Sequence, residues 1–109
     1  MSDLDLPEPI AAYFKADQRD GEAVAHCFTK QAVVKDEGQT HRGPEAIKAW
    51  KTTASAKYVY TSTPFAVEQT DGRYVVTSRL TGNFPGSPVD LRYIFRLERG
   101  KIAQMEITP

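Results

Sequence analysis

Apolar residues follow the period of a helix in the first half of the chain and the period of a strand in the second half. Helical spacing predicts one helix over residues 7–18 and a second, shorter helix that begins after Asp20, a favourable N-cap. A third helix is expected to begin at Pro44, because proline is well tolerated in a first helical turn. Its buried stripe is predicted to consist of Ile47, Trp50 and Ala54.

Alternation of apolar and polar residues predicts the strands. Residues 31–36 form the first predicted strand, with Ala32, Val34 and Asp36 on one face. The chain is expected to turn at Gly38 and to return in a brief strand through residues 40–41. Four longer strands are expected over residues 57–69, 73–82, 89–98 and 101–108.

The order of these elements predicts the fold class. Asp71-Gly72 and Arg99-Gly100 are typical two-residue turns of antiparallel hairpins, so the later strands are expected to form a meander. We therefore predict one α+β domain over residues 1–109, in which a curved antiparallel sheet wraps three helices from the N-terminal half.

Composition and charge exclude several classes of function. The chain carries 14 Lys and Arg residues against 14 Asp and Glu residues, so we expect neither a nucleic-acid nor a membrane partner. Cys27 is the single cysteine, which excludes an intrachain disulfide and a cysteine-based zinc cluster. No apolar run approaches the roughly 20 residues that span a bilayer. These features favour a cytoplasmic protein, and no cofactor or metal site is expected.

Several stretches together resemble a known family, namely residues 13–16, residues 20–24 with Phe28, and residues 32–36, 41–47, 92–97 and 100–102. The sequence is similar to the nuclear transport factor 2-like superfamily, in particular to its SnoaL-like branch of small bacterial proteins. The resemblance implies a cone-shaped, cystatin-like α+β roll with a pocket between the helices and the concave face of the sheet. It also implies a homodimer packed through the outer face of the sheet.

Asp36 is the first candidate for catalysis. The resemblance places it where ketosteroid isomerase and related cyclases hold an acid–base carboxylate. Its position in phase with Ala32 and Val34 points independently toward an apolar cavity, where desolvation raises the pKa of a carboxyl group toward a range useful for proton transfer. The alternative is a carboxylate that caps the turn at Glu37-Gly38, and both interpretations stay open.

Three further residues are candidates for assisting Asp36. The resemblance implies that Tyr13 donates a hydrogen bond to a developing oxyanion, although Tyr13 also fits a core position. His41 follows Asp36 closely enough to form a His–Asp dyad, or it fills the entrance to the third helix. The second oxyanion donor of ketosteroid isomerase, an aspartic acid on the third long strand, has no equivalent here. Arg92 lies in that neighbourhood, either facing an oxygen of the ligand or exposed and paired with Glu68 or Glu106.

Large aromatic residues provide walls for a ligand or an ordinary core. Trp50, Tyr60 and Phe84 are the predicted ligand-binding residues. The first functional hypothesis is an isomerase, cyclase or hydratase that acts on a small hydrophobic or aromatic substrate through a carboxylate acid–base. The alternative is a non-catalytic protein of the same fold that binds a hydrophobic ligand or a partner chain.

Overall fold

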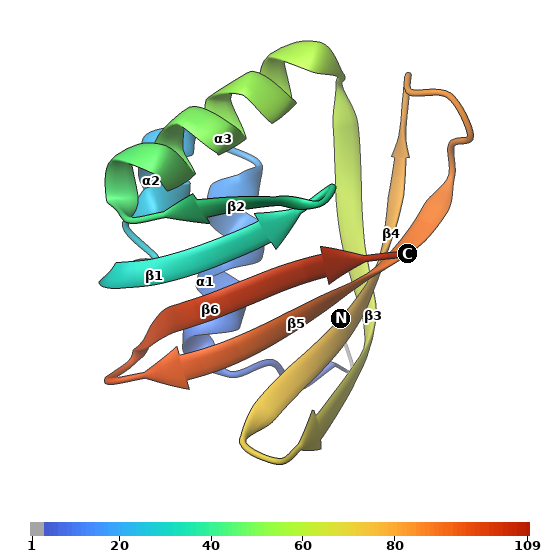
Figure 1. Cartoon of the computed structure of the whole chain (residues 1–109). Helices are drawn as coiled ribbons and strands as arrows, with labels where there is room; N and C mark the ends of the chain where they lie inside the picture. The colour runs from blue at the N-terminus through green and yellow to red at the C-terminus, as the bar shows by residue number, and fades with distance from the viewer. Residues whose placement is uncertain (1–3) are drawn as a thin grey trace.

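The computed structural model describes residues 4–109, which form three helices and six strands (Figure 1). Pro7 precedes the first helix, and Asp20 caps the second by accepting a hydrogen bond from the backbone N–H of Ala23 at 2.8 Å. Pro44 occupies the first turn of the third helix, as predicted. The helices are α1 (Glu8–Asp17), α2 (Gly21–Ala25) and α3 (Pro44–Lys57).

All six strands belong to one sheet with the order β2-β1-β6-β5-β4-β3. Neighbouring strands are antiparallel except β1 and β6, which are parallel. Register shifts interrupt the β1–β6, β3–β4 and β5–β6 pairs, and such irregularities bend strands. The strands are β1 (Phe28–Asp36), β2 (Gln39–Arg42), β3 (Tyr60–Thr70), β4 (Arg73–Gly82), β5 (Val89–Glu98) and β6 (Lys101–Thr108).

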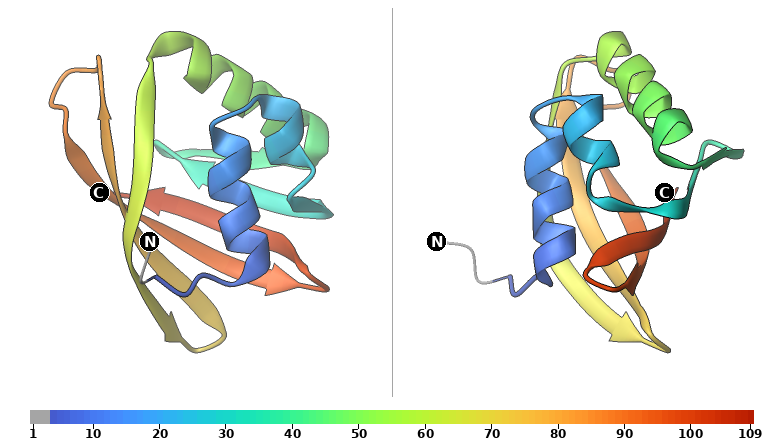
Figure 2. Two further views of the ribbon diagram at one scale, coloured as in Figure 1. Left: turned by 180° about the vertical axis from the view of Figure 1, so that it is seen from behind. Right: turned by 90° about the vertical axis from the view of Figure 1, so that its left-hand side faces the viewer.

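The connectivity brings the helices over the concave face of the sheet. Seen from behind, α1 lies across the strands (Figure 2). Since α3 follows edge strand β2 and precedes the opposite edge strand β3, it runs from one edge of the sheet to the other (Figure 1). The side chains between helices and sheet form the core, which includes Ile10, Tyr13, Phe14, Val24, Val34, Ile47, Phe95, Ile102 and Met105.

The predicted α+β fold is confirmed, including both hairpin turns. Asp71 and Arg99 have positive φ angles of 47° and 52°, and each is followed by a glycine that also has positive φ. Positive φ at both central residues is the geometry of a tight hairpin turn whose twist matches the flanking strands. Residues 37 and 38 form a third turn of this kind between β1 and β2.

Two element boundaries differ from the sequence-based expectation. Strand β1 begins at Phe28 and not at residue 31, because the backbone of Phe28 pairs with Ile102 of β6. Helix α3 continues to Lys57, so β3 begins at Tyr60. Within the described residues, no helix has the length and apolar character needed to cross a bilayer.

Candidate active-site cavity

A cavity of about 950 Å³ lies between the helices and the concave face of the sheet. Its wall consists of residues from α1 and α3, from the inner face of all six strands, and from the connection between β4 and β5. This volume is at the upper end of what small-molecule sites occupy. Much of the wall is apolar or aromatic, including Trp50, Tyr58, Phe84, Leu91, Tyr93 and Ile107.

Asp36 lines this cavity at the end of β1. Ala32 and Val34 on the same face are fully buried, so strand alternation turns the carboxylate inward as predicted. The indole Nε1 of Trp50 donates a hydrogen bond of 3.1 Å to Asp36 Oδ2. Within residues 4–109 no donor reaches the other carboxylate oxygen, Oδ1, which leaves that oxygen available to a ligand.

A buried ion pair lies beside the cavity, and Lys51 is its member in the cavity wall. The ammonium of Lys51 contacts the carboxylate of Asp17, and the two side chains are only 3% and 2% exposed. Lys51 also donates a hydrogen bond to the hydroxyl of Tyr60, which in turn donates to Asp17 Oδ1 at 3.2 Å. Each member therefore has a partner of complementary chemistry, the condition under which charges are tolerated in a protein interior.

Tyr13 is both a core residue and a cavity residue. Its ring makes edge-on or tilted contacts with Phe14, Phe28, Tyr93 and Phe95 at centroid distances of 5.2 to 6.2 Å. The same residue lines the cavity, and its hydroxyl has no hydrogen-bond partner within residues 4–109. The two alternatives for Tyr13 are therefore compatible, with a packed ring and a hydroxyl free to donate to a ligand.

Burial changes the acidity of the phenols around the cavity. Desolvation raises the pKa of Tyr13 well above its ordinary value, and the nearby Asp17 carboxylate adds to the effect. Desolvation followed by Asp17 likewise raises the pKa values of Tyr60 and Tyr93. All three phenols therefore remain protonated well above neutral pH, and each keeps a proton that it can donate in a hydrogen bond.

These raised pKa values predict a loss of stability in alkaline solution. In the unfolded chain a tyrosine releases its proton near a pH of about 10, whereas in the folded protein Tyr13, Tyr60 and Tyr93 retain theirs. The contribution of these three tyrosines to the free energy of unfolding is therefore expected to be fully present below about pH 10. Above that pH the free energy of unfolding is expected to fall. Denaturant unfolding at a series of pH values measures this slope, which is expected to be shallower in Tyr13→Phe. Phenolate absorbance from all three residues in a still-folded protein would contradict it.

His41 and Phe84 also reach the cavity. His41 packs its ring near that of Trp50, with centroids 5.9 Å apart, and the hydrogen bond to Asp36 comes from Trp50 instead of His41. Phe84 belongs to the connection between β4 and β5 and meets Tyr58 edge-on at 6.0 Å. The structure thus brings six of the seven predicted site residues to one cavity: Tyr13, Asp36, His41, Trp50, Tyr60 and Phe84.

The fold agrees with the comparison to known families. The model of the family described as SnoaL-like domain matches residues 10–105. The chain belongs to the SnoaL-like domain family. The predicted resemblance to the nuclear transport factor 2-like superfamily is confirmed with it. No curated protein matches the sequence.

Solved structures extend this comparison of the SnoaL-like domain. A "putative polyketide cyclase" from Sinorhizobium meliloti shares 38% identity with a TM-score of 0.90, and the match covers 95% of this chain and 96% of that one. A Catenulispora acidiphila protein with a ketosteroid isomerase-like fold, in complex with trimethylamine, shares 18% identity at a TM-score of 0.85, covering 96% and 87%. The epoxide hydrolase/cyclase-like enzyme SalBIII, which has a role in pyran ring formation in salinomycin, shares 20% identity with a TM-score of 0.76. That match covers 92% of this chain and 86% of SalBIII.

Arg92 lies outside the cavity of this SnoaL-like domain. It is exposed on the outer face of β5, between Thr77 of β4 and Thr108 of β6. Strand alternation separates it from its neighbours Leu91 and Tyr93, which face inward and line the cavity. Of the two alternatives for Arg92, the structure therefore shows the exposed one, and the lysines that line the cavity among residues 4–109 are Lys51 and Lys57 of α3.

Sequence reasoning missed Lys51 and Asp17, although a signal for each was present. Lys51 follows Ile47 by four residues and so lies on the buried stripe of α3. Asp17 follows Tyr13 by four residues and lies on the inner face of α1 in the same way. A lysine and an aspartate each in phase with a buried stripe are the pattern of a buried pair.

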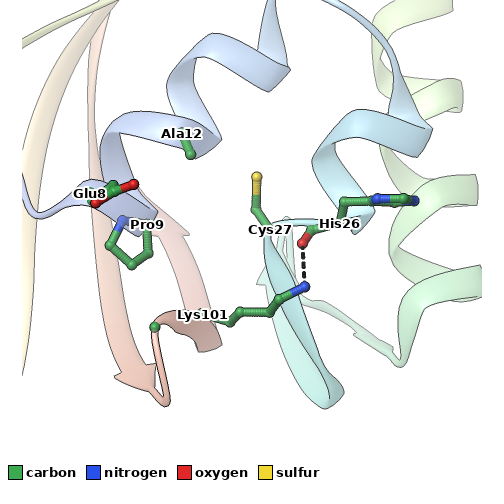
Figure 3. A pocket seen from close by; sticks show the side chains of 7 residues that line it. Glu8, Pro9, Ala12, His26, Cys27 and Lys101 are labelled. Carbon is green, nitrogen blue, oxygen red and sulfur yellow. Dashed lines mark hydrogen bonds between the residues drawn. The ribbon is translucent and has the colours of Figure 1, made fainter.

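A smaller cavity of about 360 Å³ lies beside α1, on the side of Cys27 and Lys101 (Figure 3). The Nζ of Lys101 donates a hydrogen bond of 2.9 Å to the backbone carbonyl of His26. Desolvation raises the pKa of the Cys27 thiol, although Lys101 opposes this, so the thiol is not an activated nucleophile. Across residues 4–109, no three histidine, cysteine or carboxylate side chains lie close enough together to hold a metal ion.

Proposed function

We propose that this protein is an enzyme of the isomerase, cyclase or hydratase type that moves a proton on a small hydrophobic or aromatic carbonyl compound. The observation that carries the proposal is the placement of Asp36. Its carboxylate lies in a large, mainly apolar cavity, oriented through Oδ2 by Trp50 and open to a ligand through Oδ1. A positioned carboxylate beside an apolar ligand is suited to general acid–base chemistry.

The isomerase and cyclase reactions share enolisation as their first step. Asp36 takes the proton from the carbon next to the carbonyl group, and the electrons of the broken C–H bond move to give an enolate. In an isomerase the protonated Asp36 returns the proton to a different carbon. In a cyclase the enolate carbon instead forms a bond to a second carbonyl carbon, whose oxygen receives the proton.

The other cavity residues have supporting roles in this proposal. Tyr13 donates a hydrogen bond to the carbonyl oxygen, and Trp50 fixes the orientation of Asp36. His41 lies against Trp50 and assists proton transfer at the cavity wall. Phe84 and Tyr60, with Trp50, provide aromatic surface for the ligand.

The comparisons support a ring-forming or isomerising reaction. The Sinorhizobium meliloti protein is named for a cyclase, and it matches this chain over nearly the full length of both. SalBIII is likewise described as cyclase-like. We therefore infer a substrate with the character of a polyketide, in which carbonyl groups activate neighbouring C–H bonds.

Hydrogen–deuterium exchange tests the proposal before the natural substrate is known. The ketone 2-tetralone contains an aromatic ring and has activated C–H bonds next to its carbonyl group. Exchange of these hydrogens for deuterium in D₂O is followed by the decrease of their proton NMR signals. The wild-type protein is expected to accelerate this exchange at least about 100-fold over buffer, the lower end of what a positioned acid–base contributes. Binding of 2-tetralone with exchange no faster than in buffer would instead favour the alternative, a protein that binds hydrophobic ligands without catalysis.

A further inference from the structure

We propose that Lys51 is a second hydrogen-bond donor to the ligand, and that it acts together with Tyr13 on one carbonyl oxygen. This inference rests on the proposed function, because it concerns the same cavity and the same class of ligand. The inference adds to Tyr13 of α1 a second donor, the ammonium of Lys51 on α3. It also narrows the ligand to one that presents a neutral carbonyl oxygen to a buried ammonium.

Tyr13 and Lys51 are connected through Asp17, which lies one turn after Tyr13 on α1 and forms the ion pair with Lys51. Tyr13 and Asp17 are one turn apart on α1, so their side chains share a face of that helix. Asp17 is in direct contact with the ammonium of Lys51, and Tyr13 and Lys51 both line the cavity. The hydroxyl and the ammonium therefore lie at the same end of the cavity.

Lys51 has one N–H group that no protein oxygen among the described residues accepts. A lysine ammonium has three N–H donors. Within residues 4–109 its oxygen partners are Asp17 and Tyr60, and the Tyr60 proton is already donated to Asp17. One N–H of Lys51 is thus without an oxygen partner in a side chain that is 3% exposed and forms part of the cavity wall.

The pairing with Asp17 determines which ligand oxygen suits this donor. Because the ion pair is neutral as a whole, it does not draw a fully charged anion into a cavity that also holds the Asp36 carboxylate. A neutral carbonyl oxygen meets no such repulsion. When Asp36 removes a proton, negative charge develops on that oxygen, and donors fixed around it stabilise that charge.

Lys51 thereby provides the second hydrogen-bond donor, which β5 does not provide. Ketosteroid isomerase has an acidic donor on the third long strand, whereas this chain has Arg92 there, pointing away from the cavity. The cavity obtains its second donor from α3 on the opposite wall.

Carbon-13 NMR of 2-tetralone labelled at the carbonyl carbon tests this assignment without requiring turnover. On binding to the wild-type protein, the carbonyl resonance is expected to move downfield, because donors polarise the C=O bond. The wild-type protein is compared with the variant Asp17→Asn/Lys51→Met, which lacks both charges of the buried pair. It is expected to lose most of the downfield shift and to bind 2-tetralone about tenfold more weakly, the effect of one hydrogen bond to a charged group.

Two controls separate this effect from a general change in the cavity. Tetralin, which lacks the oxygen, is expected to bind the double variant within about threefold of wild type, since its binding depends on apolar area. Lys48→Met, an exposed lysine one turn earlier on α3, is expected to retain both the shift and the affinity. The assignment is overturned if wild type shows no saturable binding of 2-tetralone, or if the double variant keeps either the shift or the affinity. A Lys51-dependent shift without catalysed exchange would refute the proposed function alone.

Discussion

Lys51→Met is expected to lower the free energy of unfolding by about 3–5 kcal/mol, a large part of the stability of a domain of this size. Methionine fills much of the space of the lysine side chain, so the loss arises mainly from electrostatics. The carboxylate of Asp17 stays 2% exposed and loses the ammonium that compensates its charge. Urea denaturation followed by circular dichroism measures the difference.

The double variant Asp17→Asn/Lys51→Met is expected to recover at least half of that loss. Neutral replacements of a buried ion pair cost far less than removal of one partner, and asparagine retains an oxygen that accepts from Tyr60. Lys48→Met is the matched control on the same helix, with an expected change within about 0.5 kcal/mol because Lys48 is exposed. A cost for the single variant no larger than that of the control would show that the pair is not buried in solution.

Much of the fold was predictable because its elements have local causes. Strand alternation fixes which side chains of β1 and β5 face inward, so the inward direction of Asp36 and Tyr93 follows from neighbouring residues alone. The turns at Asp71-Gly72 and Arg99-Gly100 likewise depend on two residues each. The parallel pairing of β1 with β6 has no such local signal, since it joins segments from the two ends of the domain.

The candidate site was predictable only where one face of one element decided it. The hydrogen bond from Trp50 to Asp36 depends on how α3 crosses β1, which no periodicity reports. The Asp17–Lys51 contact joins two helices, and polar residues on a helix are ordinarily assigned to its solvent face. For Arg92 the sequence analysis left two alternatives open, a contact with the ligand and an exposed position, although its alternation with the inward Leu91 and Tyr93 already indicated the outer face.

Asp36→Asn is expected to reduce the exchange of 2-tetralone protons by about 100- to 10,000-fold, the usual contribution of a positioned general base. The amide keeps the size of the carboxyl group and can still accept the hydrogen bond from Trp50. It cannot take up a proton at neutral pH, so binding of the ketone is expected to persist while the catalysed exchange is lost. Denaturant unfolding of the variant provides the check that its fold is intact.

Glu37→Gln is the matched control for Asp36→Asn. Glu37 is the next residue in the chain and also carries a carboxylate, but it is exposed in the turn between β1 and β2. Glutamine preserves its size and leaves the backbone of the turn unchanged. Exchange in Glu37→Gln is expected to stay within about twofold of wild type, because a solvated carboxylate contributes little beyond buffer.

The most direct test of the central claim, that Asp36 moves a proton on a ligand held in the cavity, is the rate of deuterium incorporation into saturating 2-tetralone. The rate is measured by NMR for wild type and Asp36→Asn at equal occupancy. A wild-type rate at least about 100-fold above that of the variant is the predicted result. Equal rates in the two proteins, with the ketone bound in both, would contradict the claim.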